Sequence, residues 1–153
     1  MDPFDVLLVG HVTRDILING EKEIRQPGGA VTYGAAPLNA LGKKVAVVTK
    51  LAQQDQGLLG DFHQHNIPVF ALSSRDTTQF TITYLTNDGE RRKFIVGAVA
   101  DPFTIEDFAG FQATIIHLCP LIQGEIPPEV VRHLAERSKL GLDVQGFVRV
   151  RNG

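Results

Sequence analysis

The chain has 153 residues, of which 43% are hydrophobic, and a formal net charge of -2 from 15 Lys and Arg against 17 Asp and Glu. This size fits one domain with a real core, and the charge balance argues against a nucleic-acid binder that neutralises phosphates. No apolar run reaches the roughly 18 residues that a membrane span needs, and the acidic N-terminus is unlike a signal peptide. We therefore expect a cytoplasmic protein whose partners are neither nucleic acid nor membrane.

The first elements of the chain alternate between strand and helix patterns. Residues 4–11 (FDVLLVGH) form a short apolar run with a glycine near its end, which is typical of a buried strand. Residues 14–20 and 22–26 alternate polar and apolar side chains around Asn19-Gly20, a strong hairpin signal. The segments that follow are predicted, in order, as a helix at 30–41, a strand at 44–51, a short helix at 54–66 and a strand at 67–72.

A second ribbon follows in the middle of the chain. Residues 77–98 alternate β-branched and aromatic residues with polar ones on both sides of the turn residues 87–89 (Asn-Asp-Gly). Together with the hairpin at 14–26, this ribbon is predicted to form a small second sheet. The last segments are predicted as a short helix at 103–111, a strand at 113–121, a helix at 127–138 and a strand at 139–144.

This order of elements predicts an α/β fold. The alternation of strands and helices implies a mostly parallel central sheet with covering helices, interrupted by antiparallel hairpins. Ligands of such sheets bind outside the carboxyl ends of the strands. The end of the first strand, the glycine pair Gly28-Gly29 and the stretch LDVQGF at 142–147 are all expected near such ends.

Cysteine and histidine usage indicates a reducing compartment and predicts no metal site. Cys119 is the only cysteine, so no internal disulfide can form, and we expect it to be a small buried hydrophobe. His63 and His65 are two apart in a predicted helix, where they would not share a face, and we expect both at the surface. His117 lies in an apolar strand and is expected to be a core or rim residue.

Asp15 and the glycine pair are the first candidate binding residues. Asp15 follows the first strand, where a carboxylate can accept hydroxyl hydrogen bonds from a polyol; the alternative is an exposed turn aspartate. Gly28 and Gly29 precede a helix and can bring backbone donors close to a ligand, or simply form the turn. Neither a dinucleotide fingerprint nor a P-loop is present.

The last candidates follow the final predicted strand. In an extended chain Asp143 and Gln145 would point to one face, and Arg149 lies four residues further on. The alternative is a strand end that runs into a surface loop. Position alone does not decide between these two readings.

In this order the segments resemble the N-terminal half of the ribokinase-like (PfkB) carbohydrate kinase family, over almost the whole chain. The matching features are Gly10-His11 and Asp15, the pair Gly28-Gly29 before a helix that closes at Leu41-Gly42, and the stretches VAVVTKLAQQDQG, IIHLCPLIQGEIP and LDVQGFVR. The Asp-x-Gln and arginine ending and the Gly-Glu-Ile-Pro stretch look most similar to a branch that includes myo-inositol kinases.

The resemblance implies a kinase that transfers the γ-phosphate of ATP, with Mg2+, to an alcohol group of a sugar or polyol. Residues 1–153 would be the substrate-binding half, and the hairpins at about 14–26 and 77–98 would form an antiparallel lid that excludes water and often makes a dimer surface. Tyr33 stands where many family members carry an asparagine. The implied substrate-binding residues are Asp15, Gly28, Gly29, Tyr33 and Gln145, and the implied phosphate-proximal residues are Asp143 and Arg149.

The chain also departs from the family pattern. It contains no Gly-Ala-Gly-Asp motif, which in the family supplies the catalytic base and the anion hole, so no catalytic residue is assigned. We expect a truncated chain that is inactive alone, binds neither ATP nor Mg2+ tightly, and forms a homo-oligomer through the lid or an open sheet edge. Pro37 falls inside the predicted helix, which implies a later helix start or a tolerated bend.

Two other readings stay open. The chain can be a non-catalytic sugar-binding or structural protein that kept the fold. It can also be an unrelated α/β enzyme with a site around His11, Asp15 and His117.

Overall fold

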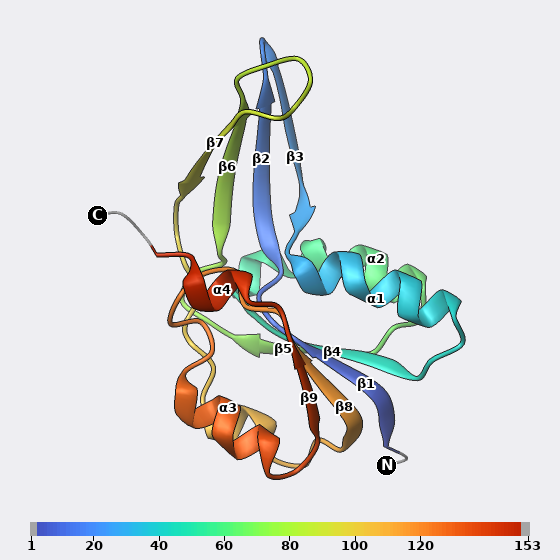
Figure 1. Cartoon of the computed structure of the whole chain (residues 1–153). Coiled ribbons are helices and arrows are strands. Elements are labelled where there is room, and N and C mark those ends of the chain that lie inside the picture. The colour runs from blue at the N-terminus through green and yellow to red at the C-terminus, as the bar shows by residue number, and fades with distance from the viewer. Residues whose placement is uncertain (1–2, 151–153) are drawn as a thin grey trace.

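The computed structural model describes residues 3–150 as a five-stranded sheet flanked by helices, with a second sheet standing on its upper edge (Figure 1). All four strand pairings in the first sheet are parallel, as predicted from the βα alternation. Its strands, in spatial order, are β5 (Val69–Ser73), β4 (Val45–Leu51), β1 (Phe4–Val9), β8 (Ala113–Leu118) and β9 (Lys139–Leu142).

Helices cover both faces of this sheet, because its strands alternate apolar side chains between two cores. Leu7 and Val9 of β1 belong to one buried cluster, and Leu8 belongs to the other. The first cluster contains the buried residues of α3, and the second contains those of α1 and α2. The helices are α1 (Ala30–Ala40), α2 (Gly60–Gln64), α3 (Pro128–Ala135) and α4 (Gln145–Val148), with 3-10 turns η1 (Gln53–Leu59) and η2 (Ile105–Phe108).

The second sheet contains the two predicted hairpins and is called the lid below; its first strand begins four residues after β1 ends. Its four strands, in spatial order, are β3 (Lys22–Gly28), β2 (Thr13–Asn19), β6 (Gln79–Tyr84) and β7 (Arg92–Val96). The two hairpins are antiparallel as predicted, but β2 and β6 pair in parallel, so the expectation of a wholly antiparallel lid is wrong. Because the long connection from β3 to β6 runs through the main sheet, β6 enters the lid from the same side as β2.

Two local predictions are corrected by the backbone. The first hairpin turns at Gly20 and Glu21, one residue beyond the expected Asn19-Gly20 pair, because Asn19 still pairs with Lys22. Within this turn Gly20 has a positive φ of 59°, and Glu21 does not have a positive φ. The segment at 54–66 is a 3-10 turn followed by a short α-helix, so its helical character is confirmed only in part.

The stretch after β9 also differs from its prediction. β9 ends at Leu142, and Gln145 opens the one-turn helix α4, so Asp143 and Gln145 are not two residues of an extended strand. Gly146 of this turn is buried against Pro120, where an added Cβ would overlap the backbone of that residue. The chain therefore coils where the sequence pattern suggested extension, since α4 packs closely on the segment after β8.

Pro37 is accommodated inside α1, which begins at Ala30 and not later. A proline at this place lacks the N–H that would bond to the carbonyl of Tyr33. Tyr33 lies on the exposed side of the helix, where water can satisfy that carbonyl. Within residues 3–150, no helix combines the length and the apolar character that crossing a bilayer requires.

Candidate functional site

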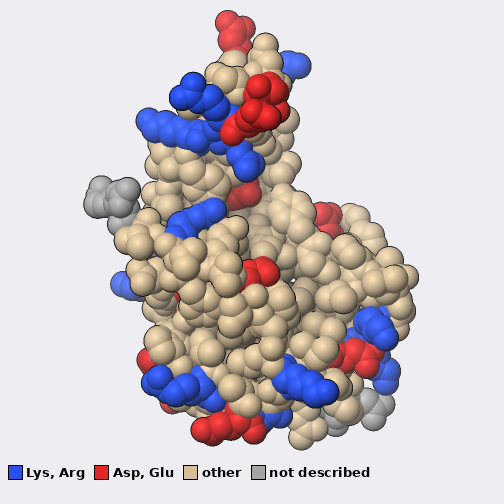
Figure 2. Space-filling model, in the orientation of Figure 1, with Lys and Arg blue, Asp and Glu red and all other residues tan. Residues whose placement is uncertain are grey.

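A pocket of about 230 Å³ lies between the lid, the start of α1 and the turn α4. Charged side chains are densest on the lid and at the lower end of the molecule (Figure 2). They are sparser where the lid joins the five-stranded sheet and its helices (Figure 2). Five of the seven residues predicted as a site line this pocket, although they come from three separate segments. The lining residues are Asp15, Gly29, Ala30, Tyr33, Phe80, Phe94, Leu121, Gln145 and Arg149.

Asp15 is the buried carboxylate of the pocket, with only 8% of its surface exposed. The hydroxyl of Thr13 donates a hydrogen bond to its Oδ1 at 2.7 Å. Burial raises the pKa of Asp15, and the Thr13 hydrogen bond opposes that shift. Among the described residues Thr13 is the one donor to this carboxylate, which leaves most of its acceptor capacity free for a ligand.

The glycine pair makes room for this aspartate and for the turn into α1. A Cβ on Gly28 would overlap the carboxylate of Asp15 and come within 2.7 Å of the Thr13 hydroxyl. Gly29 has a φ of 95° and lies against the carbonyl of His11, so a side chain there is excluded by both space and conformation. Gly29 lines the pocket, whereas Gly28 lies beneath Asp15 and acts through it.

An aromatic wall closes the lid side of the pocket. The rings of Phe80 and Phe94 lie with their centroids 4.8 Å apart, and the guanidinium of Arg149 lies 4.7 Å from the Phe94 centroid. Burial and the charge of Arg92 lower the pKa of Arg149, which stays cationic at neutral pH. Phe80 and Phe94 were not among the predicted site residues, although the alternating aromatic pattern of residues 77–98 indicates that they share one face of the sheet.

Tyr33 and Gln145 form the opposite, more open rim. Tyr33 is 61% exposed, and its phenol oxygen accepts a hydrogen bond from the Gln26 amide at 3.4 Å. Gln145 is also exposed at the start of α4. Both side chains are therefore free to turn toward a ligand in the pocket.

Asp143 lies outside the lining of this pocket. Its Oδ1 is 3.2 Å from Nε2 of His117, and both side chains are partly exposed. Cys119 lies beside this pair and is buried as predicted; burial and the charges of Asp143 and Glu125 raise the pKa of its thiol. A buried, protonated thiol is a poor nucleophile, so this group does not have the chemistry of a cysteine hydrolase.

His11 and Glu125 form a second buried polar centre, which belongs to the scaffold. The carboxylate of Glu125 accepts hydrogen bonds from the backbone N–H groups of His11 and Leu121, each at 2.8 Å. The His11 ring bonds to the Thr78 hydroxyl at 2.9 Å and the Asp101 carbonyl at 3.2 Å. Burial lowers the pKa of His11, so the ring is neutral and its partners are all internal.

The alternative site around His11, Asp15 and His117 does not assemble. His11 is fully buried and bonded inside the scaffold, while His117 pairs with Asp143 at another strand end. No hydrogen bond or ion pair among the described residues joins the two histidines. His63 and His65 are exposed on and beside α2, as predicted.

Comparison with known proteins places the fold among kinases. No protein-family model matches the chain, and no curated protein matches it either. A pyrophosphate-dependent kinase in the ribokinase family, solved with a pyrophosphate analog and myo-inositol, matches at TM-score 0.88 with 30% identity over 96% of this chain and 52% of that one. A sulfate complex of a pyrophosphate-dependent kinase in the same family matches at 0.87 with 32% identity, over 96% of this chain and 52% of that chain.

A more distant match has the same fold. The ribokinase of Arabidopsis thaliana, solved with ribose and ATP, matches at TM-score 0.68 with 17% identity over 94% of this chain and 54% of that one. The chain spans about half the length of the solved structures it matches.

Proposed function

Because the chain has the fold of the N-terminal half of ribokinase-family kinases, we propose that it is the acceptor-binding and lid half of a sugar or polyol kinase. The observation that carries the proposal is the pocket in which Asp15, Gly29, Tyr33, Gln145 and Arg149 meet under the lid. Nothing local in the sequence brings these three segments together, so their meeting is an independent support for the resemblance.

The proposed ligand is a ring polyol, and the chemistry of the lining supports this class. The largely unsatisfied carboxylate of Asp15 accepts hydrogen bonds from two neighbouring hydroxyls. Phe80 and Phe94 line the pocket and offer an apolar surface for the C–H groups of a ring. The solved relative at 30% identity holds myo-inositol, which makes inositols the first ligands to test.

Phosphoryl transfer is proposed to need groups that this chain does not contain. Catalysis of this reaction is almost entirely positioning and electrostatic stabilisation of the transferring phosphoryl group. The chain has Arg149 at the pocket, but no Gly-Ala-Gly-Asp motif to supply an anion hole and a base. We therefore expect ligand binding without turnover, and a phosphorylation rate like that of an ordinary sugar kinase would contradict this part of the proposal.

The phosphate donor is a separate question from the acceptor. Ribokinases with the same fold have been solved with ATP or ADP, while the relatives at 30% and 32% identity are pyrophosphate-dependent. We propose ATP with Mg2+ as the family donor and expect neither to bind this chain tightly. Pyrophosphate is the alternative donor and is tested beside ATP in the same binding experiment.

A thermal-shift screen tests the proposal. The chain is mixed with inositols, ribose and nucleosides, each alone, with Mg-ATP, or with pyrophosphate, because a ligand of the folded state raises the midpoint by mass action. We expect a rise with one polyol class that Asp15→Ala abolishes, and no rise with either donor alone. A rise that survives in Asp15→Ala, or no rise with any polyol at millimolar concentration, would overturn the proposed pocket.

Self-association is the remaining proposal about partners. Exposed apolar side chains gather on the lid and near the β9 edge, which has no neighbour within the described sheet. They are Ile24, Leu85, Phe94 and Ile95 on the lid, and Ile115, Leu142, Val144 and Val148 near the edge. Sedimentation at micromolar concentration is expected to show a homo-oligomer, and a compact monomer alone would contradict this.

A further inference from the structure

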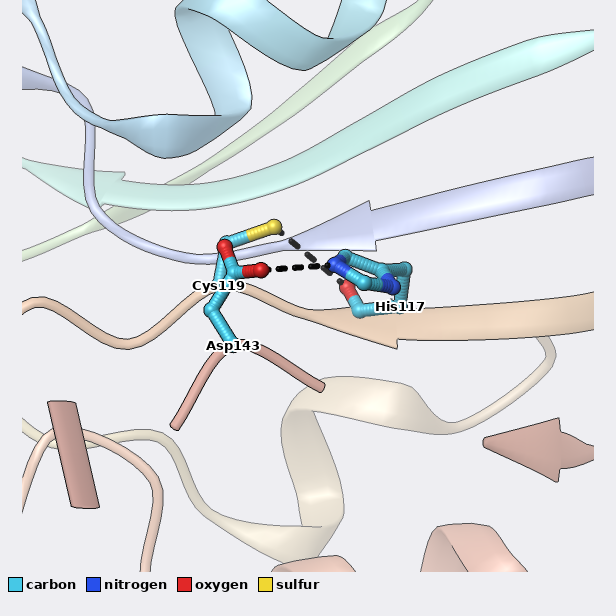
Figure 3. A group of neighbouring side chains, drawn as sticks. All are labelled: His117, Cys119 and Asp143. Carbon is cyan, nitrogen blue, oxygen red and sulfur yellow. Dashed lines mark hydrogen bonds and ion pairs between the residues drawn. The ribbon is translucent and has the colours of Figure 1, made fainter. Parts of the chain in front are cut away.

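His117, Cys119 and Asp143 form a cluster at the carboxyl ends of β8 and β9 (Figure 3). Each offers one ligating atom, and these atoms all lie within 4.8 Å of one another. Within residues 3–150 this is the one group of three such side chains that a single metal ion can reach. The candidate pocket does not use it, since none of the three lines that pocket.

The topology of the sheet explains why these residues meet. His117 and Cys119 are two apart along the chain, so their side chains leave the sheet on the same face. β8 pairs in parallel with β9 so that His117 stands beside Gly141, which brings Asp143 beside Cys119. The backbone N–H of Asp143 donates to the Leu118 carbonyl at 2.9 Å, which fixes this register beyond the end of β9.

Gly141 leaves the space in which the histidine ring lies. A Cβ at that position would come within 2.5 Å of Nδ1 of His117, so any side chain would displace the ring. With Nδ1 packed against Gly141, the other nitrogen, Nε2, faces Asp143 at 3.2 Å. The ring is therefore held with one nitrogen aimed at the carboxylate, on the side where Cys119 lies.

The spacing of these atoms fits a tetrahedral ion. Zinc bonds of about 2.0–2.1 Å to nitrogen and oxygen separate two tetrahedral ligands by roughly 3.3 Å, close to the distance between His117 and Asp143. The ligating atoms lie up to 4.8 Å apart, which is about 1.5 Å more than that spacing, so metal binding requires the partly exposed side chains of His117 and Asp143 to move toward a common centre. Glu125 adds a further negative charge close to Cys119, which favours a cation here.

We propose that His117, Cys119 and Asp143 bind a divalent transition metal of the zinc class, through one imidazole nitrogen, one carboxylate oxygen and the sulfur of Cys119, whose thiol releases its proton to solvent when the metal binds. Sulfur and imidazole ligands select zinc and its neighbours over magnesium or calcium, which prefer oxygen alone. Three protein ligands leave a fourth position open to water. This departs from the sequence prediction of no metal site, and it does not depend on the proposed kinase function.

Cobalt(II) is the probe for the test, because it takes zinc sites and is visible by absorption. The full chain, with its cysteine reduced, is titrated with cobalt and then with zinc as competitor. We expect one cobalt per chain, a thiolate-to-cobalt charge-transfer band, visible bands of tetrahedral intensity, and displacement by zinc. An octahedral spectrum without the charge-transfer band would overturn the proposal.

Matched variants connect the spectrum to the three residues. Cys119→Ser is expected to remove the charge-transfer band, and Asp143→Asn and His117→Ala to weaken cobalt binding at least ten-fold. His63→Ala changes an exposed histidine outside the cluster and is expected to leave the titration unchanged. Asp143 is partly exposed, so Asp143→Asn retains the fold even if a change at buried Cys119 does not. Unchanged affinity in Asp143→Asn and His117→Ala would refute the site.

Discussion

The His11–Glu125 centre and the Asp15 pocket both lie where β1 passes into the lid, and both contain buried ionisable groups. In the centre every polar group has an internal partner: Glu125 accepts two backbone N–H groups, and both His11 nitrogens are bonded. In the pocket Asp15 has one internal donor and faces open space. We interpret this difference as one between polar residues that stabilise the fold and a carboxylate that is proposed to bind a ligand.

The largest effect on stability is expected at the centre. Glu125→Ala leaves the backbone N–H groups of His11 and Leu121 buried without an acceptor, which costs about 3–5 kcal/mol in the free energy of unfolding. Urea unfolding followed by circular dichroism measures this loss. Glu136→Ala, at an exposed position after α3, is the control and is expected to unfold like the parent chain. If Glu125→Ala changed the free energy of unfolding as little as Glu136→Ala does, the distinction between the two regions would not hold.

Gly28→Ala tests the contact between the glycine pair and the pocket. The new methyl group overlaps the Asp15 carboxylate, so we expect a loss of about 1–3 kcal/mol in stability and at least ten-fold weaker polyol binding. Gly60→Ala is the matched control, because Gly60 has helical angles and no atom within 4 Å of an added Cβ. Full polyol affinity in Gly28→Ala would show that the position of Asp15 is not critical.

The pH dependence of stability tests the neutral state of His11. Its pKa is lowered in the folded chain, so below the ordinary value of 6.5 the unfolded chain takes up a proton that the folded chain refuses. Stability from this residue is complete above about pH 6.5 and falls with decreasing pH, by at most about 1.4 kcal/mol per pH unit. His11→Asn is expected to be less stable but to lose this slope, whereas His63→Asn keeps it. An unchanged slope in His11→Asn would assign the dependence to another group.

The smallest effect on stability is expected at the contact between Arg149, which follows α4, and Phe94 of the lid. Arg149→Lys keeps the charge but replaces the planar group over Phe94, at a cost of about 0.5–1 kcal/mol. Because β7 contributes that ring, its amides are expected to exchange with solvent faster in the variant, measured by hydrogen exchange. Unchanged exchange would mean that Arg149 does not restrain the lid.

Local patterns predicted most of the elements, and non-local contacts produced the differences. The Asn19-Gly20 signal located the first hairpin to within one residue because turn chemistry is local. The parallel pairing of β2 and β6 joins strands separated by about 60 residues, which no periodicity encodes. Residues 143–147 coil because Gly146 packs on Pro120, a contact that is not visible in the stretch itself.

The same contrast holds for the candidate site. The resemblance to the ribokinase-like family is confirmed at the level of fold, and it selected Asp15, Gly29, Tyr33, Gln145 and Arg149, which the structure brings together. It did not select Phe94, whose contact with Arg149 depends on the lid packing over α4. Glu125 had no local signal, because its function is to bond the backbone N–H of a residue 114 positions away.

Calorimetric titration of an inositol into the chain and into Asp15→Asn tests whether Asp15 binds a polyol. Burial raises the pKa of Asp15, which means that its charge opposes folding at neutral pH, so Asp15→Asn is expected to unfold no more easily than the parent chain. Asp88→Asn, at the exposed tip of the lid, is the control. We expect heat of binding for the parent chain and Asp88→Asn, and at least ten-fold weaker binding for a stably folded Asp15→Asn. Equal binding by all three chains would contradict the proposal that Asp15 holds the polyol.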